Sequence, residues 1–227
     1  MRVSETRLPF LQRLGAETRE MVLSGSRTTT LQAGSVIYHP GDPDQAAILD
    51  EGMARSYIGD GTGRQTTVWF PRSGDLMGGL LVMHLPAPGW MELLTDATLT
   101  YLDLANLRGL VDGNVEVARA MAGVLAERYE HTIETLAIRG FGSVSQRLAF
   151  DLLERSRVDG GGALVTCATH QDLADSIGSA REVIGRTLSD LRARKLISTS
   201  RAQIRIVDAG GLYELASSGV LSLAENA

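Results

Sequence analysis

The sequence contains one cysteine, one lysine and no long apolar run. Cys167 alone cannot form a disulfide within the chain or hold an iron–sulfur cluster, which takes several thiolates. No stretch approaches about 18 consecutive apolar residues, and the first residues have no uninterrupted apolar core, so we expect neither a membrane span nor a signal peptide. These absences predict a cytoplasmic protein with an ordinary hydrophobic core, for which 44% apolar residues are ample.

The charge of the chain is negative overall but positive in one region. A formal net charge of −5 argues against a protein that coats nucleic acid with its whole surface. Between residues 170 and 207, however, seven basic side chains stand against four acidic ones. Because Lys195 is the only lysine, these cations are almost all arginines, which suit paired hydrogen bonds to phosphate or guanine. A bias in genomic composition would also explain the shortage of lysine.

Short apolar runs separated by glycine turns follow one another from about residue 27 to residue 107. Runs of about four to eight residues, with a turn after each, are typical of a small antiparallel β-roll or sandwich. A short helical segment precedes them. We therefore expect residues 1–110 to form a β-roll.

A long amphipathic helix is expected after the roll. Residues 111–138 contain no proline, and one stripe of side chains recurs at steps of three and four residues. The members of this stripe are Met121, Leu125, Tyr129, Thr132 and Leu136. About 25 helical residues extend about 40 Å, too far to be covered by one small roll. A second copy of the helix would cover the stripe in a homodimer, although a groove within the chain could also do so.

The last third of the chain has the pattern of a winged helix-turn-helix. Gly140, Gly142 and Ser143 predict a hinge, which is followed by a helix over SVSQRLAFDLLERS. A strand (ALVTC), two short helices and a polar hairpin (ISTSRAQIRIVD) come next, and this order is that of the winged motif. Thr169 and Ser179 are placed to cap the two short helices.

The second short helix, expected over 179–193, has an apolar and a charged side. The apolar stripe consists of Ile184, Leu188 and Leu191. Arg181, Glu182 and Arg186 fall opposite this stripe. Arginine can donate two hydrogen bonds to guanine, and a carboxylate can accept from the amine of cytosine, so these three residues are predicted to contact bases in a major groove. The competing interpretation is a capping acid, Glu182, beside a solvated face with an ion pair.

The helix pair resembles the DNA-binding signature of a known family. THQDLADSIG followed by SAREVIGRTLSDLRARKLI is similar to the pattern of the Crp/Fnr superfamily of bacterial transcription regulators. AGSVIYHPGDPDQAAILDEGMARSYI and SGDLMGG look like the β-roll of that family. The resemblance implies an α+β fold: an N-terminal antiparallel β-roll of the cyclic-nucleotide-binding jelly-roll type (1–110), a dimerisation helix (111–139) and a C-terminal winged helix-turn-helix (140–227).

The resemblance also implies a function and partners. The chain would be a sequence-specific transcription regulator that binds double-stranded DNA as a homodimer, has RNA polymerase as a further partner and is not an enzyme. Arg181, Glu182 and Arg186 match the family's base-contacting positions, and Gly185 is typical of the branch that reads inverted repeats of TGTGA-like half-sites. The predicted contacts to the DNA backbone are Thr169, Ser179, Arg201 and Arg205.

The resemblance leaves the effector open. Members that bind cyclic AMP carry a glutamate after a glycine, and then an arginine and a serine that hold the phosphate. Here Gly78 is followed by Gly79, and Gly89 and Trp90 occupy the approximate positions of the arginine and the serine. A buried cyclic phosphate without an opposing cation would be destabilised by several kcal/mol. We therefore expect a signal other than a cyclic nucleotide.

An apolar segment lies where that phosphate site would be. It could hold an apolar or aromatic small molecule, or it could have closed into a core. His84 beside Met83 could ligate haem, although a lone histidine is more often a surface or satisfied core residue. On the long helix Thr132 matches an adenine-contacting threonine of the family, whereas Ile133 replaces the neighbouring serine. The candidate effector-pocket residues are Gly78, Gly79, Met83, His84, Trp90, Thr132 and Ile133.

Other reactive side chains predict no catalytic or metal site. Cys167 is expected to be a small buried hydrophobe in the strand before the two short helices, with a thiol switch as the alternative. His39, His131 and His170 have no metal-ligand spacing, and His170 is interpreted as the start of a helix. The alternative to a DNA-binding regulator is a small-molecule or haem-binding sensor whose helix-turn-helix acts as a partner surface.

Overall fold

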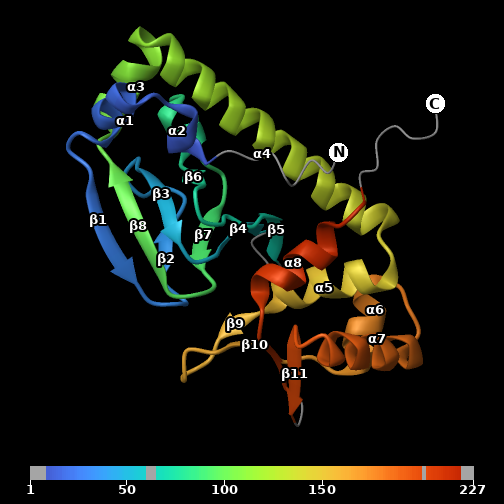
Figure 1. Cartoon of the computed structure of the whole chain (residues 1–227). Helices are drawn as coiled ribbons and strands as arrows, with labels where there is room; N and C mark the ends of the chain where they lie inside the picture. Colours follow the sequence, from blue (N-terminus) through green and yellow to red (C-terminus); the bar gives the residue numbers. More distant parts are fainter. Residues whose placement is uncertain (1–8, 60–64, 201–202, 221–227) are drawn as a thin grey trace, which may run out of the picture. The chain divides into compact units, whose positions relative to one another are not determined.

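A computed structural model of the chain describes residues 9–59, 65–200 and 203–220 (Figure 1). Its contacts divide the chain into two compact units, Met1–Glu130 and His131–Ala227. The boundary falls within the long helix α4 (Val115–Phe141), whose last turns belong to the second unit. Each unit has its own hydrophobic core.

Two four-stranded antiparallel sheets form the N-terminal unit, which confirms the predicted β-roll. The first sheet has the order β1 (Arg27–Leu31), β8 (Ala97–Leu102), β3 (Ala46–Glu51) and β6 (Leu76–Met77). The second sheet has the order β2 (Val36–Tyr38), β7 (Trp90–Leu93), β4 (Ala54–Gly59) and β5 (Gln65–Trp69).

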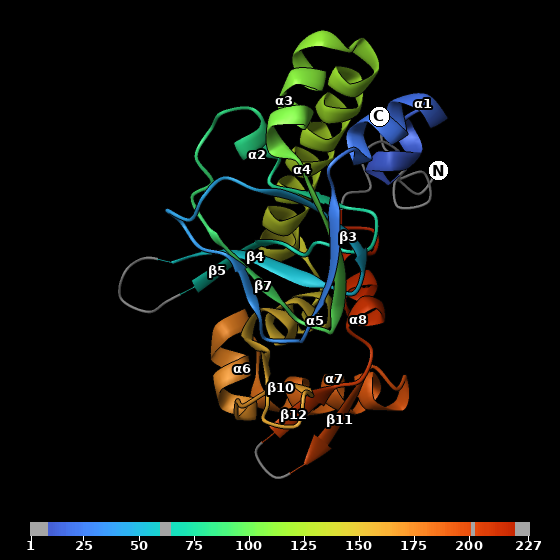
Figure 2. The same cartoon turned by 90° about the vertical axis from the view of Figure 1, so that its left-hand side faces the viewer.

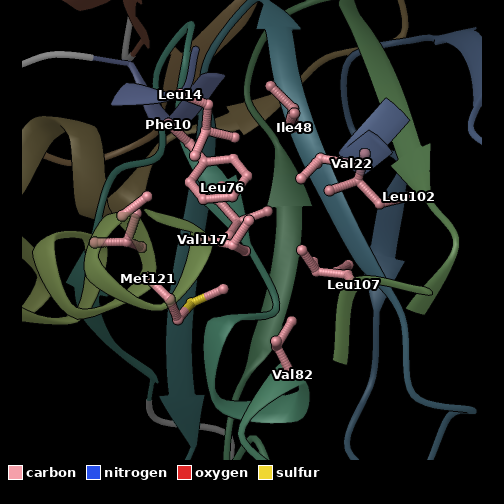
Figure 3. Close-up of a cluster of buried hydrophobic side chains, with 13 residues drawn as sticks. Phe10, Leu14, Val22, Ile48, Leu76, Val82, Leu102, Leu107, Val117 and Met121 are labelled. Atoms are coloured by element: carbon pink, nitrogen blue, oxygen red, sulfur yellow. The ribbon is translucent and has the colours of Figure 1, made fainter. Parts of the chain in front are cut away.

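Strand β3 is buried on both faces because the first sheet has packing partners on both sides. Ala47 and Leu49 belong to the core between the two sheets, whereas Ala46 and Ile48 belong to a second core under helices. This alternation follows from the two-residue period of a strand. The second core is closed by α1 (Ala16–Leu23), α3 (Leu104–Gly113) and the first half of α4, as Figure 3 shows.

The helix expected from residue 111 onward is interrupted, which corrects the prediction of a single helix. α3 ends at Gly113 and α4 begins at Val115. Asn114 between them has an extended backbone, and its Oδ1 accepts hydrogen bonds from the backbone nitrogens of Glu116 (2.9 Å) and Val117 (3.3 Å). The side chain of Asn114 therefore caps a new helix.

The stripe predicted along α4 does not have one environment. Met121 is buried in the roll core and Leu125 packs against it, whereas Tyr129 and Leu136 are 69% and 61% exposed. A different row of exposed side chains follows α4 at steps of three, four and seven residues: Val115, Ala122, Ala126, Tyr129 and Leu136. This is heptad spacing, which keeps one seam along a helix.

The C-terminal unit is a winged helix-turn-helix, as predicted. Its helices are α5 (Val144–Arg155), α6 (His170–Ile177), α7 (Arg181–Ala193) and α8 (Ala209–Ser217). Its sheet has the order β11 (Ile197–Ser200), β12 (Gln203–Ile206), β10 (Leu164–Thr166) and β9 (Arg157–Val158), and Figure 2 shows β12 beside β11. α8 packs on α5 and was not predicted, because Gly210 and Gly211 weaken its helical pattern. Asp208 compensates by accepting a hydrogen bond from the backbone of Gly211 (2.8 Å).

The connection between α4 and α5 lies at the predicted hinge. Ser143 and Gln146 form a capping box that begins α5. Arg147, on the first turn of α5, donates a hydrogen bond to the carbonyl of Gly142 and another from Nε to the carbonyl of Ile177 (3.2 Å). One guanidinium thus joins the end of α4 to the end of α6.

Gly78 and Gly41 provide a matched test of packing in the roll. Both have positive φ, but a Cβ at Gly78 would overlap the carbonyl oxygen of Gln45, whereas a Cβ at Gly41 would meet no atom within 4 Å. We expect Gly41→Ala to lower the free energy of unfolding by about 1–2 kcal/mol. Gly78→Ala should cost at least about twice as much. Denaturant unfolding followed by tryptophan fluorescence measures both, and equal losses would contradict the close approach at Gly78.

Candidate nucleic-acid interface

α6 begins where the sequence predicts. The hydroxyl of Thr169 accepts a hydrogen bond from the backbone nitrogen of Asp172 (3.1 Å), and Asp172 Oδ2 accepts one from the backbone nitrogen of Thr169 (2.8 Å). The backbone hydrogen bond from Thr169, and then the one from its hydroxyl, lower the pKa of Asp172. This capping box makes His170 the first residue of α6, as expected.

α7 begins later than predicted. α6 ends in a left-handed turn at Gly178, and the backbone nitrogen of Ser179 donates to the carbonyl of Ala174 (2.9 Å). Ser179 therefore closes α6, and the N-cap of α7 is Ala180, which makes no side-chain hydrogen bond. The predicted Ser179 cap is wrong, and Glu182, the second residue of α7, is not a capping-box acid.

The three predicted base-contacting residues lie on the exposed side of α7. Arg181, Glu182 and Arg186 are exposed. The opposite side of the helix is buried, at 0%, 3% and 0% exposure for Ile184, Leu188 and Leu191. Within the described residues, none of the three charged side chains forms an ion pair or a hydrogen bond with its own chain. The structure therefore does not support the competing interpretation of a capping acid beside a paired arginine.

A hollow of about 480 Å³ lies between the starts of α6 and α7. Thr169, His170 and Gln171 line it from α6, and Arg181 lines it from α7. Gly185 borders this region, because a Cβ there would lie 3.7 Å from Nδ1 of His170. Sequence reasoning missed Gln171 and gave His170 no role beyond starting a helix. The sequence did contain a sign of this position. His170 and Gln171 directly follow the Thr169 cap, so they lie at the start of α6, as Arg181 lies at the start of α7.

The wing carries one of the predicted backbone-contacting arginines in an exposed position. Arg205 is exposed on β12 between the buried residues Ile204 and Ile206. Its strand neighbours are Ser198 on β11 and Val165 on β10. The predicted contact Arg201 lies outside the described residues.

Arg192 connects α7 to the wing, and sequence reasoning missed it. Its guanidinium donates to the hydroxyl of Ser189 (2.6 Å) on α7 and to the hydroxyl of Thr199 (3.1 Å) on β11. One side chain thus holds α7 and β11 together.

Two predicted effector residues after α2 (Gly79–Val82) face outward. Met83 is 40% exposed, and His84 is exposed with a φ of +57°. The single turn of α2 directs Leu81 and Val82 inward, which leaves the following residues at the surface. Met83 and His84 therefore do not belong to a closed apolar core, and their place in an effector pocket stays a prediction. Gly78 and Gly79 are well packed, since a Cβ at Gly79 would lie 3.6 Å from Leu125 of α4.

Trp90 belongs to a stack of side chains on β4 and β7. Its ring lies nearly parallel to that of Tyr57, with centroids 5.6 Å apart, and His39 meets it edge-on. The guanidinium of Arg55 lies 4.3 Å from the centre of the Tyr57 ring and pairs with Glu92 (2.9 Å). Arg55 is fully buried, and sequence reasoning missed it because a charge within a strand gives no sign of its depth.

Arg128 on α4 is a second overlooked cation of the roll. Its guanidinium lies 2.9 Å from the centre of the Trp69 ring and donates to the carbonyl of Leu76 (3.4 Å). Thr132 and Ile133 lie farther along α4 in the second unit, where both are half-buried. Both Arg55 and Arg128 are thus engaged by protein groups.

Cys167 is exposed, which corrects the expectation of a buried side chain. β10 ends at Thr166, so Cys167 lies in the connection to α6 and not in the sheet. In the part of the chain that the structure describes, no group of three or more His, Cys, Asp and Glu side chains could hold a metal ion. None of the helices described is both long and apolar enough to cross a bilayer.

Comparison with known proteins agrees with this architecture. Residues 28–114 match the cyclic nucleotide-binding domain family, and residues 146–215 match the Crp-like helix-turn-helix domain family. The transcriptional regulator SdrP of Thermus thermophilus is 31% identical over 198 residues, which cover 84% of this chain and 95% of SdrP. The chain belongs to the Crp/Fnr family. It is a Crp/Fnr-type transcriptional regulator with a helix-turn-helix.

Other Crp/Fnr proteins resemble the chain over nearly its whole length. The probable transcriptional regulator flp of Lacticaseibacillus casei is 22% identical over 210 residues, which cover 92% of this chain and 96% of flp. A crystal structure of a Crp/Fnr-family regulator from Eubacterium rectale covers 93% of this chain and 99% of its own, with a TM-score of 0.59 and 22% identity. These likenesses support the predicted fold of roll, long helix and winged domain.

Thr169 and Ser179 provide a matched test of the helix starts in this Crp/Fnr chain. Thr169→Ala removes a capping hydroxyl and should lower the free energy of unfolding by about 1 kcal/mol. Ser179→Ala should have little effect, because no hydrogen bond of its side chain holds α7. Denaturant unfolding of the C-terminal unit, followed by circular dichroism, measures both. An equal loss for Ser179→Ala would restore the predicted cap.

Proposed function

We propose that this Crp/Fnr regulator is a homodimer that reads DNA with α7 in the major groove. The observation that carries the proposal is the exposed set Arg181, Glu182 and Arg186, which has no intrachain partner among the described residues and lies opposite a fully buried stripe. Because the buried stripe fixes the rotation of α7, these side chains are presented outward before DNA arrives. The N-terminal end of a recognition helix is the part that enters the groove.

Each of the three side chains has a chemical role in reading bases. Arg181 and Arg186 can donate bidentate hydrogen bonds to guanine, and Glu182 can accept from the amine of cytosine. One good bidentate pair contributes about 1–3 kcal/mol of discrimination against the wrong base. Together with Gly185, this set supports TGTGA-like half-sites arranged as an inverted repeat.

Contacts to phosphate would fix the register of α7 on the duplex. Arg205 is exposed on β12, and Thr169 lines the hollow between α6 and α7. Ser179 and Arg201 remain proposed contacts, the latter outside the described residues. Contacts of this kind add affinity for any sequence and depend on salt.

The exposed heptad row on α4 supports the homodimer. Val115, Ala122, Tyr129 and Leu136 are exposed at intervals of seven residues, and a coiled coil requires this spacing. Three large side chains of this row, Val115, Tyr129 and Leu136, are 68%, 69% and 61% exposed, and burying such a row against a second surface removes apolar area from water. A second copy of α4 provides the same row and would duplicate the reading surface on the two halves of an inverted repeat.

The signal is proposed to be something other than a cyclic nucleotide. Gly79 supplies no carboxylate for a ribose, and the cations Arg55 and Arg128 are already engaged by Glu92, Trp69 and backbone oxygen. The outward position of His84 also gives no support to haem. RNA polymerase is proposed as the partner through which a bound dimer would act on transcription.

Replacing single arginines separates base reading from backbone binding. Arg181→Ala or Arg186→Ala should lower the affinity for a TGTGA inverted repeat about ten- to hundredfold for each half-site while leaving the affinity for random duplex nearly unchanged. Arg205→Ala should weaken both duplexes equally and reduce the salt slope by about 0.9 for each subunit bound. Fluorescence anisotropy titrations over a series of salt concentrations measure these quantities. Equal losses on both duplexes for Arg181→Ala and Arg186→Ala would refute their assignment as base readers.

A charge in the heptad row tests the dimer. Leu136→Glu would place two unpaired carboxylates in a symmetric interface, so the dimer dissociation constant should rise about a hundredfold or more. Glu130→Arg, an exposed change beside the row on the same helix, is the control and should leave the dimer nearly intact. Sedimentation velocity over a dilution series measures both. A Leu136→Glu protein that dimerises like the wild type would show that α4 does not form the interface.

A further inference from the structure

Arg192 presents a positive charge at the junction between α7 and the wing. Its guanidinium is held by two neutral groups, the hydroxyl of Ser189 (2.6 Å) and the hydroxyl of Thr199 (3.1 Å). All three side chains are exposed. We propose, building on the function proposed above, that Arg192 and these two hydroxyls form a site for a phosphate of the DNA backbone, separate from the bases that Arg181 and Arg186 read.

A neighbouring arginine shows why the partners of Arg192 matter. Arg194 lies 3.9 Å from a carboxylate oxygen of Asp190, so these two charges largely offset each other. A hydroxyl accepts a hydrogen bond from arginine but carries no net charge, and within the described part of the chain Arg192 forms no ion pair. Both terminal nitrogens of Arg192 also keep a further N–H with which they can bind phosphate oxygens. Its charge and its donors therefore suit an anion.

Arg192 leaves α7 on the same side as Arg181. The two residues are eleven positions apart, which is about three full turns of an α-helix. Along the helix axis this spacing corresponds to about 16 Å, whereas the major groove is about 12 Å wide. When the N-terminal end of α7 reads bases, Arg192 at the other end therefore comes to the edge of the groove, where the phosphates lie.

The two hydroxyls fix the guanidinium of Arg192 before DNA arrives. Ser189 lies one turn earlier on α7, and Thr199 approaches from β11, so the side chain is held from two elements. A free arginine side chain would lose this conformational freedom on meeting a partner. The site therefore lowers the entropic cost of the contact, and it does so for any DNA sequence, because every base pair carries the same phosphates.

Removing the charge of Arg192 tests the contact. Arg192→Ala should reduce the slope of log affinity against log salt by about 0.9 for each subunit bound, because one phosphate in each half-site is no longer neutralised. At about 0.1 M salt the affinity should fall about five- to tenfold for each subunit, equally for a TGTGA inverted repeat and for a random duplex. Fluorescence anisotropy titrations of the full-length protein over a series of salt concentrations measure the slope and both affinities.

Two further variants separate the charge of Arg192 from its surroundings. Arg192→Lys keeps the positive charge, so its salt slope should stay at the wild-type value. Arg194→Ala is the matched control, because it removes an exposed arginine of the same segment whose charge Asp190 already offsets. Its slope should stay nearly unchanged.

Variants of Thr199 test whether the hydroxyl orders the guanidinium. Thr199→Val keeps the shape of the side chain and every charge, so the slope should not change, while the affinity for both duplexes should fall about two- to fivefold for each subunit. Thr199→Ser keeps the hydroxyl and should bind like the wild type. In an Arg192→Ala background, Thr199→Val should have no further effect, because the side chain that the hydroxyl holds is gone.

The outcomes separate this inference from the proposed function. A wild-type slope in Arg192→Ala, an equal loss in Arg194→Ala, or a loss confined to the TGTGA repeat would overturn the phosphate site and leave the reading of bases intact. A full effect of Thr199→Val in the Arg192→Ala background would overturn the site as well. Absence of preference for any duplex at low salt would overturn both proposals. A slope that falls in Arg192→Ala but not in Arg192→Lys or Arg194→Ala would establish the contact.

Discussion

The burial of one side of α7 is the constraint on which the proposed DNA-binding surface depends. Ile184, Leu188 and Leu191 are almost completely removed from solvent, and burying each such side chain stabilises the fold by about 1.5–3 kcal/mol. A rotation of α7 about its axis would expose all three. The charged side chains opposite them are therefore directed outward by packing and not by ion pairs. The helix backbone that carries them is already ordered, and only their side-chain rotamers remain to be fixed by a contact.

α4 is divided between two kinds of packing. Val117 and Met121 face the roll and close its second core, while Ala122 and Tyr129 lie on the exposed side of the same helix. Neighbouring residues of α4 thus belong either to a core within the chain or to the exposed row that would form the proposed dimer interface. Any displacement of the roll core against α4 would change the seam as well.

The sequence predicted the β-roll and the winged domain because both produce strong local patterns. Turn glycines punctuate the roll, and Thr169, Asp172 and Gly178 mark the helix-turn-helix through capping and left-handed geometry. Periodicity was also sufficient for the buried stripe of α7. Helix α8 could not be predicted from local pattern, because its two glycines lower the helix propensity of the segment. Packing on α5 stabilises the helix in spite of this low propensity.

Errors arose where a backbone interaction or tertiary packing decided the outcome. Ser179 looked like a cap, but its backbone was needed to close α6. Asn114 looked like an ordinary helical residue, but its side chain starts α4. The exposed Cys167 and the fully buried Arg55 depend on distances across the fold that no local pattern encodes.

The guanidinium of Arg147 has a mechanical consequence. It bonds at once to the carbonyl that follows α4 and to the last carbonyl of α6, just before the left-handed residue from which the chain turns into α7. Twisting the end of the long helix must either stretch one of these bonds or drag the bend at Gly178 with it. Arg147 therefore couples a rotation of the end of α4 to the turn that precedes α7.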